Sequence, residues 1–230
     1  MNEIYSEEES ENDIIENDIE IESIGDLIIK DLKLYKVIIL GDSKVGKSSI
    51  SYRILKNEFK EDLSSNIISD VQNYKIKVKN QKFIIQLWDN CISDDFDKNT
   101  SNLFNNVSIA ILVYSINNRK SFEKISVWNN ILYNQCFDCI KFLIGNKNDL
   151  EEERQVQKEE GENLKDEYNF SYFFETSSKN GINIKILLNN IVISLYEKFR
   201  TELTRIPDSI SITKHDYRNR KTIGKSKKCC

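Results

Sequence analysis

The sequence predicts an α/β protein with a mostly parallel, six-stranded sheet and helices on both faces. Apolar, strand-like segments alternate with amphipathic, helix-like segments along most of the chain. The run IAILVYSI at 109–116 is apolar almost throughout, which is typical of a strand covered on both faces. A glycine-rich loop joins the first such strand to the first helix, and ligands of these sheets bind at the carboxyl ends of the strands.

The expected elements follow from the spacing of apolar residues. Phe122, Ile125 and Trp128 recur with helical spacing, and 184–200 is strongly amphipathic. A turn at 79–81 joins two strands into a hairpin. The expected strands are 33–40, 73–78, 82–88, 109–116, 140–145 and 172–176, and the expected helices are 48–57, 121–133, 155–168 and 184–200.

Composition divides the chain into three parts. Residues 1–31 hold 12 acidic residues and one basic residue, and this segment is expected to be disordered. Residues 32–200 form the expected domain, and 201–230 form a flexible, basic tail. The formal net charge of −4 argues against general nucleic-acid binding. The acidic start lacks the pattern of a secretion signal, and the odd number of cysteines, five, indicates reduced thiols in the cytosol.

A phosphate-binding pattern, G-x-x-x-x-G-K-[ST], lies at 41–48 between an expected strand and an expected helix. Its glycines let the backbone approach a phosphate, and the helix N-terminus adds positive potential. Lys47 is expected to contact the outer phosphates and Ser48 to ligate Mg²⁺. Lys44 either adds positive charge near the phosphates or points to solvent. The expected phosphate-binding residues are Gly41, Asp42, Ser43, Lys44, Val45, Gly46, Lys47, Ser48 and Ser49.

A base-binding pattern follows two later strands. The segment NKND at 146–149 resembles the N-K-x-D element of Ras-like GTPases, and ETSSK at 175–179 resembles their E-T-S-A-K element. The Asp149 carboxylate can accept hydrogen bonds from guanine N1–H and the exocyclic amine, a donor pair that adenine lacks. Lys147 would pack over the base, and Asn146 would tie this loop to the phosphate loop. The expected guanine-binding residues are Phe59, Asn146, Lys147, Asp149, Ser177, Ser178 and Lys179.

Over roughly 34–200 the chain resembles the Rab branch of the Ras superfamily. Beyond the loops above, Leu87-Trp88-Asp89 matches the strand end before the second switch segment of these proteins. Phe59 occupies the place of the aromatic residue that stacks on the guanine edge, or else anchors its own loop. The resemblance implies a P-loop NTPase G domain that uses GTP/GDP and Mg²⁺. The metal ligands that it implies are Ser48, Asn66 and Asp89.

The two switch segments depart from the Rab pattern. Asn66 replaces the threonine that ligates Mg²⁺ and meets the γ-phosphate; its amide carbonyl is a different possible ligand. In DNCISD at 89–94, where Rab proteins read D-T-A-G-Q-E, Ile92 replaces the glycine and Ser93 the glutamine. Ser93 stands at the water-positioning site and is the one candidate catalytic residue, but serine is too short for the task. Nucleotide binding is therefore expected to be retained and hydrolysis to be weak.

The chain ends in KKCC at 227–230, which resembles the double prenylation signal of Rab proteins. Two lipids anchor a protein stably where one is marginal, so Cys229 and Cys230 are the expected lipidation sites. Basic residues between 214 and 228 would add attraction to an anionic membrane. The alternative is an unmodified pair of thiols. The acidic residues 1–31 are either a solvated extension or a partner of this basic tail or of a regulator.

These expectations combine into a membrane-anchored switch in vesicle-mediated or intracellular protein transport. It would lie on the cytoplasmic face of an endomembrane, with a soluble cytosolic pool. The resemblance implies an exchange factor, an escort or dissociation-inhibitor protein and effectors as partners. The alternative is a nucleotide-binding pseudo-GTPase that acts as a membrane scaffold. A P-loop kinase is a third class, disfavoured by Asp149 and the terminal cysteines. Cys136 and Cys139 have zinc-ligand spacing but lack a second pair.

Overall fold

The computed structural model describes residues 19–23, 32–61, 71–78, 81–89, 101–136 and 138–204. The chain divides into two compact units, Met1–Tyr196 and Glu197–Cys230, and the described part of the second is the end of one helix. The predicted boundaries after residues 31 and 200 stay predictions.

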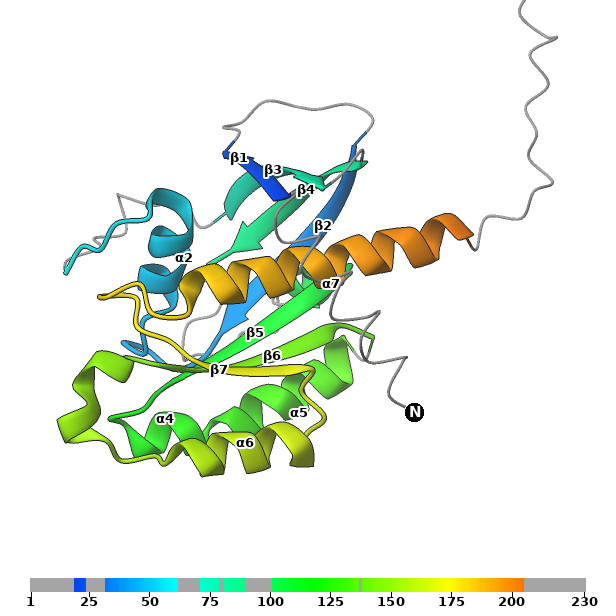
Figure 1. Cartoon of the computed structure of the whole chain (residues 1–230). Coiled ribbons are helices and arrows are strands. Elements are labelled where there is room, and N and C mark those ends of the chain that lie inside the picture. The colour runs from blue at the N-terminus through cyan, green and yellow to red at the C-terminus, as the bar shows by residue number, and fades with distance from the viewer. Residues whose placement is uncertain are drawn as a thin grey trace, which may run out of the picture. The chain divides into compact units, whose positions relative to one another are not determined.

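A seven-stranded sheet forms the centre of the first unit (Figure 1). Its order is β1-β3-β4-β2-β5-β6-β7, and neighbouring strands from β4 to β7 are parallel. Strand β3 is antiparallel to β4, and β1 is antiparallel to β3. The mostly parallel α/β sheet is thus confirmed. The bounds are β1 Ile19–Ser23, β2 Lys33–Leu40, β3 Val71–Val78, β4 Gln81–Trp88, β5 Val107–Ser115, β6 Ile140–Asn146 and β7 Tyr172–Glu175.

Strand β1 is a correction to the sequence analysis, which expected a six-stranded sheet and disorder throughout 1–31. Residues 19–23 instead pair with β3 and add a seventh strand. The reason is local, because isoleucine and glutamate alternate in IEIES with the period of a strand. The acidic composition of the longer segment concealed this short pattern. The rest of 1–31 lies outside the described residues.

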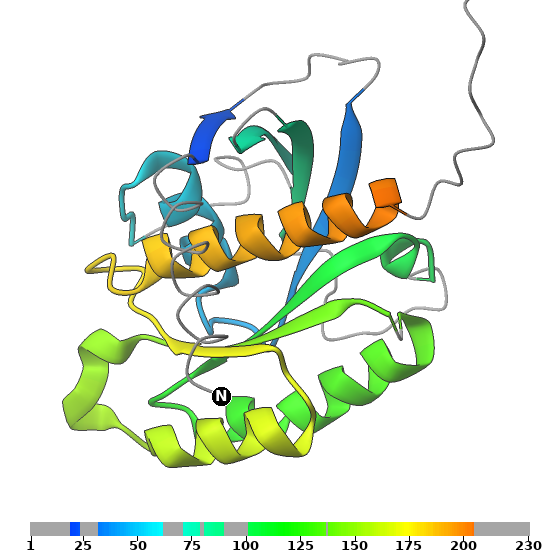
Figure 2. The same ribbon diagram turned by 45° about the vertical axis from the view of Figure 1, so that its right-hand side comes forward.

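Helices cover both faces of the sheet, as expected. In Figures 1 and 2, α2 and the first part of α7 lie on one face, and α4, α5 and α6 lie on the other. The segment 121–133 was expected as one helix but is divided at Lys124 into α4 and α5. The helical bounds are α2 Lys47–Lys56, α3 Ser101–Phe104, α4 Arg119–Glu123, α5 Ile125–Gln135, the 3₁₀ helix η2 Asn148–Glu153, α6 Lys158–Glu167 and α7 Ile184–Thr204.

The core lies on both sides of β5, in which every residue is buried. On one side Tyr114 packs edge-on against Phe122, with ring centroids 4.9 Å apart. Helix α6 approaches this layer closely, because a Cβ on Gly161 would lie 2.8 Å from the Tyr114 hydroxyl. This packing fixes the carboxyl ends of β2, β5 and β6 side by side, and the loops that follow these strands form the candidate site.

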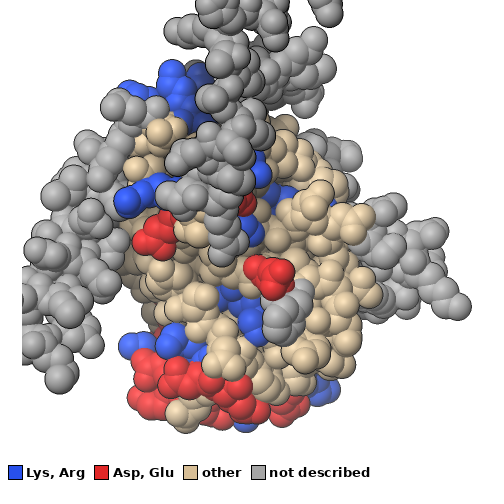
Figure 3. Space-filling model, turned by 90° about the vertical axis from the view of Figure 1, so that its right-hand side faces the viewer, with Lys and Arg blue, Asp and Glu red and all other residues tan. Residues whose placement is uncertain are grey.

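Charged side chains are unevenly placed on the face drawn in Figure 3. Acidic side chains gather at its lower end, the level of α6 in Figure 1, with some basic ones beside them, and basic side chains lie toward its upper end, the level of β3 and β4. Helix α6 reads KEEGENLKDE, whereas β3 reads VQNYKIKV. Among the described residues, no helix has the length and apolar character needed to cross a bilayer.

Candidate nucleotide-binding site

The loop between β2 and α2 is shaped by two glycines in left-handed or related conformations. Gly41 has φ +147°, and a Cβ there would lie 2.1 Å from the carbonyl oxygen of Val113 in β5. Gly46 has φ +100°, and its Cβ would lie 2.2 Å from Nδ2 of Asn146. Side chains are therefore excluded at both positions. The Lys47 ammonium donates to the carbonyl oxygens of Gly41 and Asp42, at 2.9 and 2.7 Å, so it lies over the loop.

Asn146, the last residue of β6, links this loop to the predicted base loop. Its Nδ2 donates to the Val45 carbonyl oxygen at 2.9 Å. Its Oδ1 accepts from the Thr176 hydroxyl at 3.2 Å and from the Ser178 backbone N–H at 3.3 Å. The side chain is 1% exposed, so these bonds are shielded from water. The predicted tie between the two loops is present in the structure.

Asp149 is held in the wall of the site by its neighbours. Lys147 takes a left-handed conformation, φ +66°, and turns the chain from β6 into η2. The Ser177 hydroxyl donates to Oδ1 of Asp149 at 2.6 Å and accepts from the Asn180 backbone N–H at 3.0 Å. Ser177 is completely buried. It therefore orients the predicted guanine-binding carboxylate instead of lining the cavity.

Arg53 of α2 fastens the base loop from the other side, a role that the sequence analysis missed. Its Nε donates to the Ser178 carbonyl oxygen at 2.8 Å, and one Nη donates to that of Lys179 at 2.5 Å. Because more than a hundred residues separate these partners, no local pattern announces the contact. The helix that begins at the phosphate loop thus also positions the predicted base loop.

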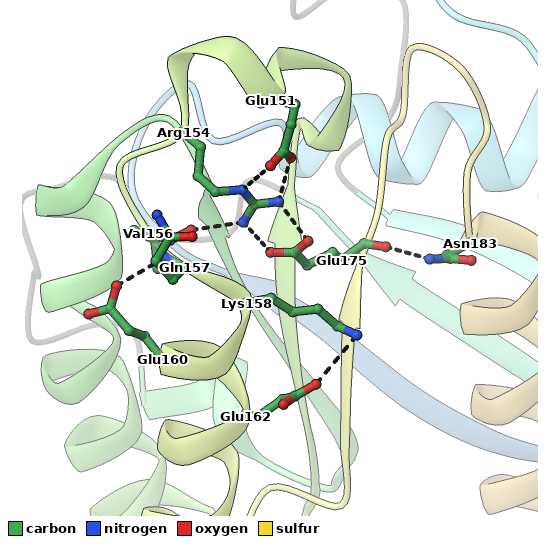
Figure 4. Close-up of polar contacts among 9 residues, drawn as sticks. All are labelled: Glu151, Arg154, Val156, Gln157, Lys158, Glu160, Glu162, Glu175 and Asn183. Carbon is green, nitrogen blue, oxygen red and sulfur yellow. Dashed lines mark hydrogen bonds and ion pairs between the residues drawn. The ribbon is translucent and has the colours of Figure 1, made fainter.

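A buried ion pair braces the two halves of the base-binding region (Figure 4). The Arg154 guanidinium donates to both carboxylate oxygens of Glu175, at 2.6 and 2.9 Å, and also binds Glu151. Glu175 and then Glu151 hold the pKa of Arg154 above its usual value, and Arg154 lowers the pKa of Glu151. Asn183 donates to the Glu175 carbonyl oxygen at 2.7 Å. The pair therefore joins η2, the element that carries Asp149, to the end of β7.

These groups surround a cavity of about 710 Å³. Four predicted nucleotide-binding residues, Gly41, Asp42, Val45 and Ser177, are not among its lining residues, and neither is the predicted metal ligand Asp89. The Asp42 carboxylate instead pairs with the Lys124 ammonium at 2.9 Å. Glu61 and Leu150 line the cavity and were not predicted. The lining residues are Ser43, Lys44, Gly46, Lys47, Ser48, Ser49, Phe59, Glu61, Asn146, Lys147, Asp149, Leu150, Ser178 and Lys179.

The predicted metal ligands are described only in part. Ser48 lines the cavity, and Asp89 follows β4 with 1% of its surface exposed. A carboxylate so deeply buried needs cationic or hydrogen-bonding neighbours, and hydroxyl and carboxylate oxygens suit Mg²⁺. Asn66, Ile92 and Ser93 lie outside the described residues, as do Cys229 and Cys230. Across the described part of the chain, no three His, Cys, Asp or Glu residues cluster, and Cys136 and Cys139 are in the reduced, thiol form.

A strand–loop–helix phosphate motif in a sheet of this order, with a base loop after β6, defines a P-loop NTPase of the G-domain type. The family model "Ras family" matches residues 36–197, and the chain belongs to this family. It is a Rab-like small GTPase. "Ras-related protein Rab-10" of Caenorhabditis elegans is 32% identical over 83% of this chain and 89% of its own length. "Ras-related protein Rab-8A" of Pongo abelii is 35% identical over 66% of this chain and 73% of its own length.

Proposed function

We propose that this GTPase binds GTP and GDP in the cavity and acts as a membrane-anchored switch in vesicle-mediated transport. The observation that carries the proposal is the single cavity formed by the phosphate loop and the base loop, joined through Asn146. The phosphates would lie at Lys47 and the start of α2, and guanine would lie at Asp149 and Lys147. Phe59, also in the cavity wall, would contact the base or sugar.

Mg²⁺ would be held by oxygen ligands at the phosphate end. Ser48 and Asp89 supply a hydroxyl and a carboxylate, and Asn66 would supply an amide carbonyl. The bound ion would offset phosphate charge in the reaction. The chain's own contribution is to position the phosphates with Lys47 and the backbone amides of the loop.

Guanine selection is tested by Asp149→Asn. Xanthine keeps the N1–H donor of guanine but carries a carbonyl in place of the amine, and an amide side chain can pair with both groups. The variant should lose roughly 10- to 100-fold in GDP affinity and gain affinity for XDP. Titration with fluorescent GDP and fluorescent XDP, with wild type as control, measures this change in base specificity. Equal GDP affinity in both proteins would place guanine elsewhere.

Hydrolysis is proposed to be slow, because isoleucine at position 92 allows less backbone freedom than glycine, and the serine side chain at position 93 is shorter than that of glutamine. Single-turnover assays should show GDP forming over hours in wild type. The variant Ile92→Gly/Ser93→Gln should be faster by at least about tenfold. An equal rate in the two proteins would contradict this account. Bound GTP that never turns over in wild type would favour the alternative function, a scaffold that does not cycle.

Membrane anchoring would place the switch on the cytoplasmic face of an endomembrane, with a soluble pool in the cytosol. The support is the terminal KKCC and the basic residues before it. An exchange factor, an escort or dissociation-inhibitor protein and effectors would be its partners. In cells, Cys229→Ser/Cys230→Ser should move the protein to the soluble fraction, whereas Cys136→Ser should not. Membrane recovery of the double variant equal to wild type would rule out lipidation at these residues.

A further inference from the structure

A second cavity, of about 590 Å³, adjoins the candidate nucleotide-binding cavity. Lys44 of the phosphate loop and Lys147 of the base loop line both cavities. The first cavity continues onto the start of α2, whereas the second continues onto α4, and Figure 1 shows these helices on opposite faces of the sheet. The loop after β5 and Gln155, which precedes α6, complete the second cavity. It is therefore a separate space that shares one wall with the nucleotide site.

Unpaired positive charge gathers at the second cavity. Its lining includes Lys44, Lys120 and Lys147, whose ammonium groups form no hydrogen bond or ion pair with the described residues. Arg119 also lines the cavity, but two carboxylates already hold its guanidinium, at 3.5 and 2.5 Å. Among the described lining residues only Glu123 is acidic, and it is one of those two partners. The charge that remains available to a ligand is therefore that of the three lysines.

Two amide side chains in the lining are oriented by bonds to backbone groups. Oδ1 of Asn118 accepts from the Ser121 backbone N–H at 3.2 Å, and Oε1 of Gln155 accepts from the Arg119 backbone N–H at 3.0 Å. The oxygen end of each amide is thus engaged, and its NH₂ group forms no hydrogen bond with the described residues. The cavity therefore offers amide and ammonium donors together, a set that suits an anion rich in acceptor oxygens.

The backbone at Lys44 adds independent support for a role of its side chain. Its φ is +64°, in the left-handed region, where a Cβ is sterically unfavourable and glycine is preferred. Strained residues of this kind gather at ligand-binding sites. The phosphate loop thus carries a lysine at a strained position, and this lysine lies between two cavities that both suit anions.

We propose that the second cavity binds a small phosphorylated anion and that its occupation weakens the binding of a nucleotide in the first cavity. A doubly ionised phosphate group accepts several charge-assisted hydrogen bonds and brings no donor that would be left unpaired. An acidic peptide would bring backbone N–H groups to a lining that consists mainly of donors, so the phosphate fits better. The volume of the cavity lies within the roughly 300–1,000 Å³ typical of small-molecule sites.

The coupling between the two cavities follows from the shared lysines, and it rests on the proposed function. An anion in the second cavity attracts Lys44 and Lys147 away from the nucleotide phosphates, and its own charge repels those phosphates. By linkage, the nucleotide weakens binding of the anion by the same factor. Nucleotide release would thus depend on the concentration of a phosphate compound.

The binding test is an NMR titration of the full chain, loaded with GDP and Mg²⁺, at an ionic strength held constant with chloride. The probes are inorganic phosphate and glucose 6-phosphate, and the one that binds more tightly identifies free phosphate or a phosphate ester as the source. Both probes should shift the backbone amide signals of Lys120 and Gln155. Lys120→Met removes a charge that lines only the second cavity, so the affinity for both probes should fall by at least about tenfold.

A matched variant controls for the loss of one positive charge. Lys56→Met removes an exposed lysine that lines neither cavity, and this variant should bind both probes as wild type does. Equal affinity of Lys120→Met and wild type, or no binding of either probe, would overturn the proposal. Tighter binding of an acidic peptide of residues 2–18 than of both phosphates would overturn the assignment to a phosphorylated anion.

The coupling is measured as the release rate of fluorescent GDP into excess unlabelled GDP. Saturating glucose 6-phosphate should speed release by at least about fivefold in wild type and in Lys56→Met, and should leave Lys120→Met unchanged. Competition for the first cavity alone would not alter this rate, because excess GDP already prevents rebinding. An unchanged rate in wild type would overturn the coupling. Failure of the chain to load GDP would instead refute the proposed function, and the shifts at Lys120 and Gln155 would still test the second cavity.

Discussion

Replacing Arg154 by methionine should destabilise the protein by about 3 kcal/mol. The Arg154 and Glu175 side chains are 10% and 7% exposed, and the guanidinium makes two hydrogen bonds to the carboxylate. The variant would leave the buried Glu175 carboxylate without its cationic partner and would remove the donor to the Val156 carbonyl oxygen. Breaking a buried pair typically costs about 3–5 kcal/mol, and partial exposure of Arg154 favours the lower end.

Two control variants test whether the loss of stability comes from breaking a buried ion pair. Arg119→Met removes a pair with Glu160 in which the side chains are 43% and 35% exposed, and should cost far less than Arg154→Met, because water screens an exposed pair. Arg154→Met/Glu175→Met removes both charges and should recover most of the loss, because apolar replacement of a buried pair is often nearly neutral.

Urea unfolding at saturating GDP and Mg²⁺, equal in all samples, measures these free energies. The raised pKa of Arg154 means that its stabilising effect is fully present below the unfolded pKa. It is lost only as pH rises through the folded pKa, so the difference from wild type should be constant between about pH 6 and about pH 9. The reasoning fails if Arg154→Met costs no more than Arg119→Met, or if the double variant is as unstable as the single one.

Three further predictions concern the loops and the thiols. Gly46→Ala should lower stability by more than about 1 kcal/mol, because its Cβ would meet Asn146; an unchanged Tm in thermal unfolding would contradict this. Arg53→Met should speed release of fluorescent GDP by about fivefold or more with little change in Tm, since it frees the base loop; an unchanged release rate would argue against it. A hydrogen bond with Cys136 and then burial raise the pKa of Cys139. Its thiolate is therefore scarcer at about pH 8, and iodoacetamide should label Cys136 before Cys139, as followed by mass spectrometry; faster labelling of Cys139 would contradict this.

Local patterns made much of the fold and site predictable. The alternation of strands and helices depends on the nearest few residues, and so does the phosphate loop. Asn146 and Asp149 were identifiable because Asn146 ends a buried strand and Asp149 lies in the loop just beyond it. The start of α6 was placed three residues too early, because a capping box formed by Gln157 and Glu160 begins the helix at Lys158.

The features that were not predicted depend on contacts between residues far apart in the sequence, or were hidden by the average composition of a longer segment. Arg53 contacts residues more than a hundred positions away, and the pairing of Arg154 with Glu175 requires knowledge of where β7 lies. Neither leaves a mark in the adjoining sequence. Strand β1 was missed for another reason, since mean composition over 1–31 conceals five residues that suit a strand.

The lining of the cavity also has a kinetic consequence. Lys44, Lys47, Lys147 and Lys179 face Glu61 and Asp149 there, which leaves a surplus of two positive charges. Such a surplus draws anions toward the cavity from beyond contact distance, and dissolved salt screens it. The association rate of a nucleotide di- or triphosphate should therefore be high at low ionic strength and should fall steeply as salt is added. Its dissociation rate, which short-range contacts govern, should change far less.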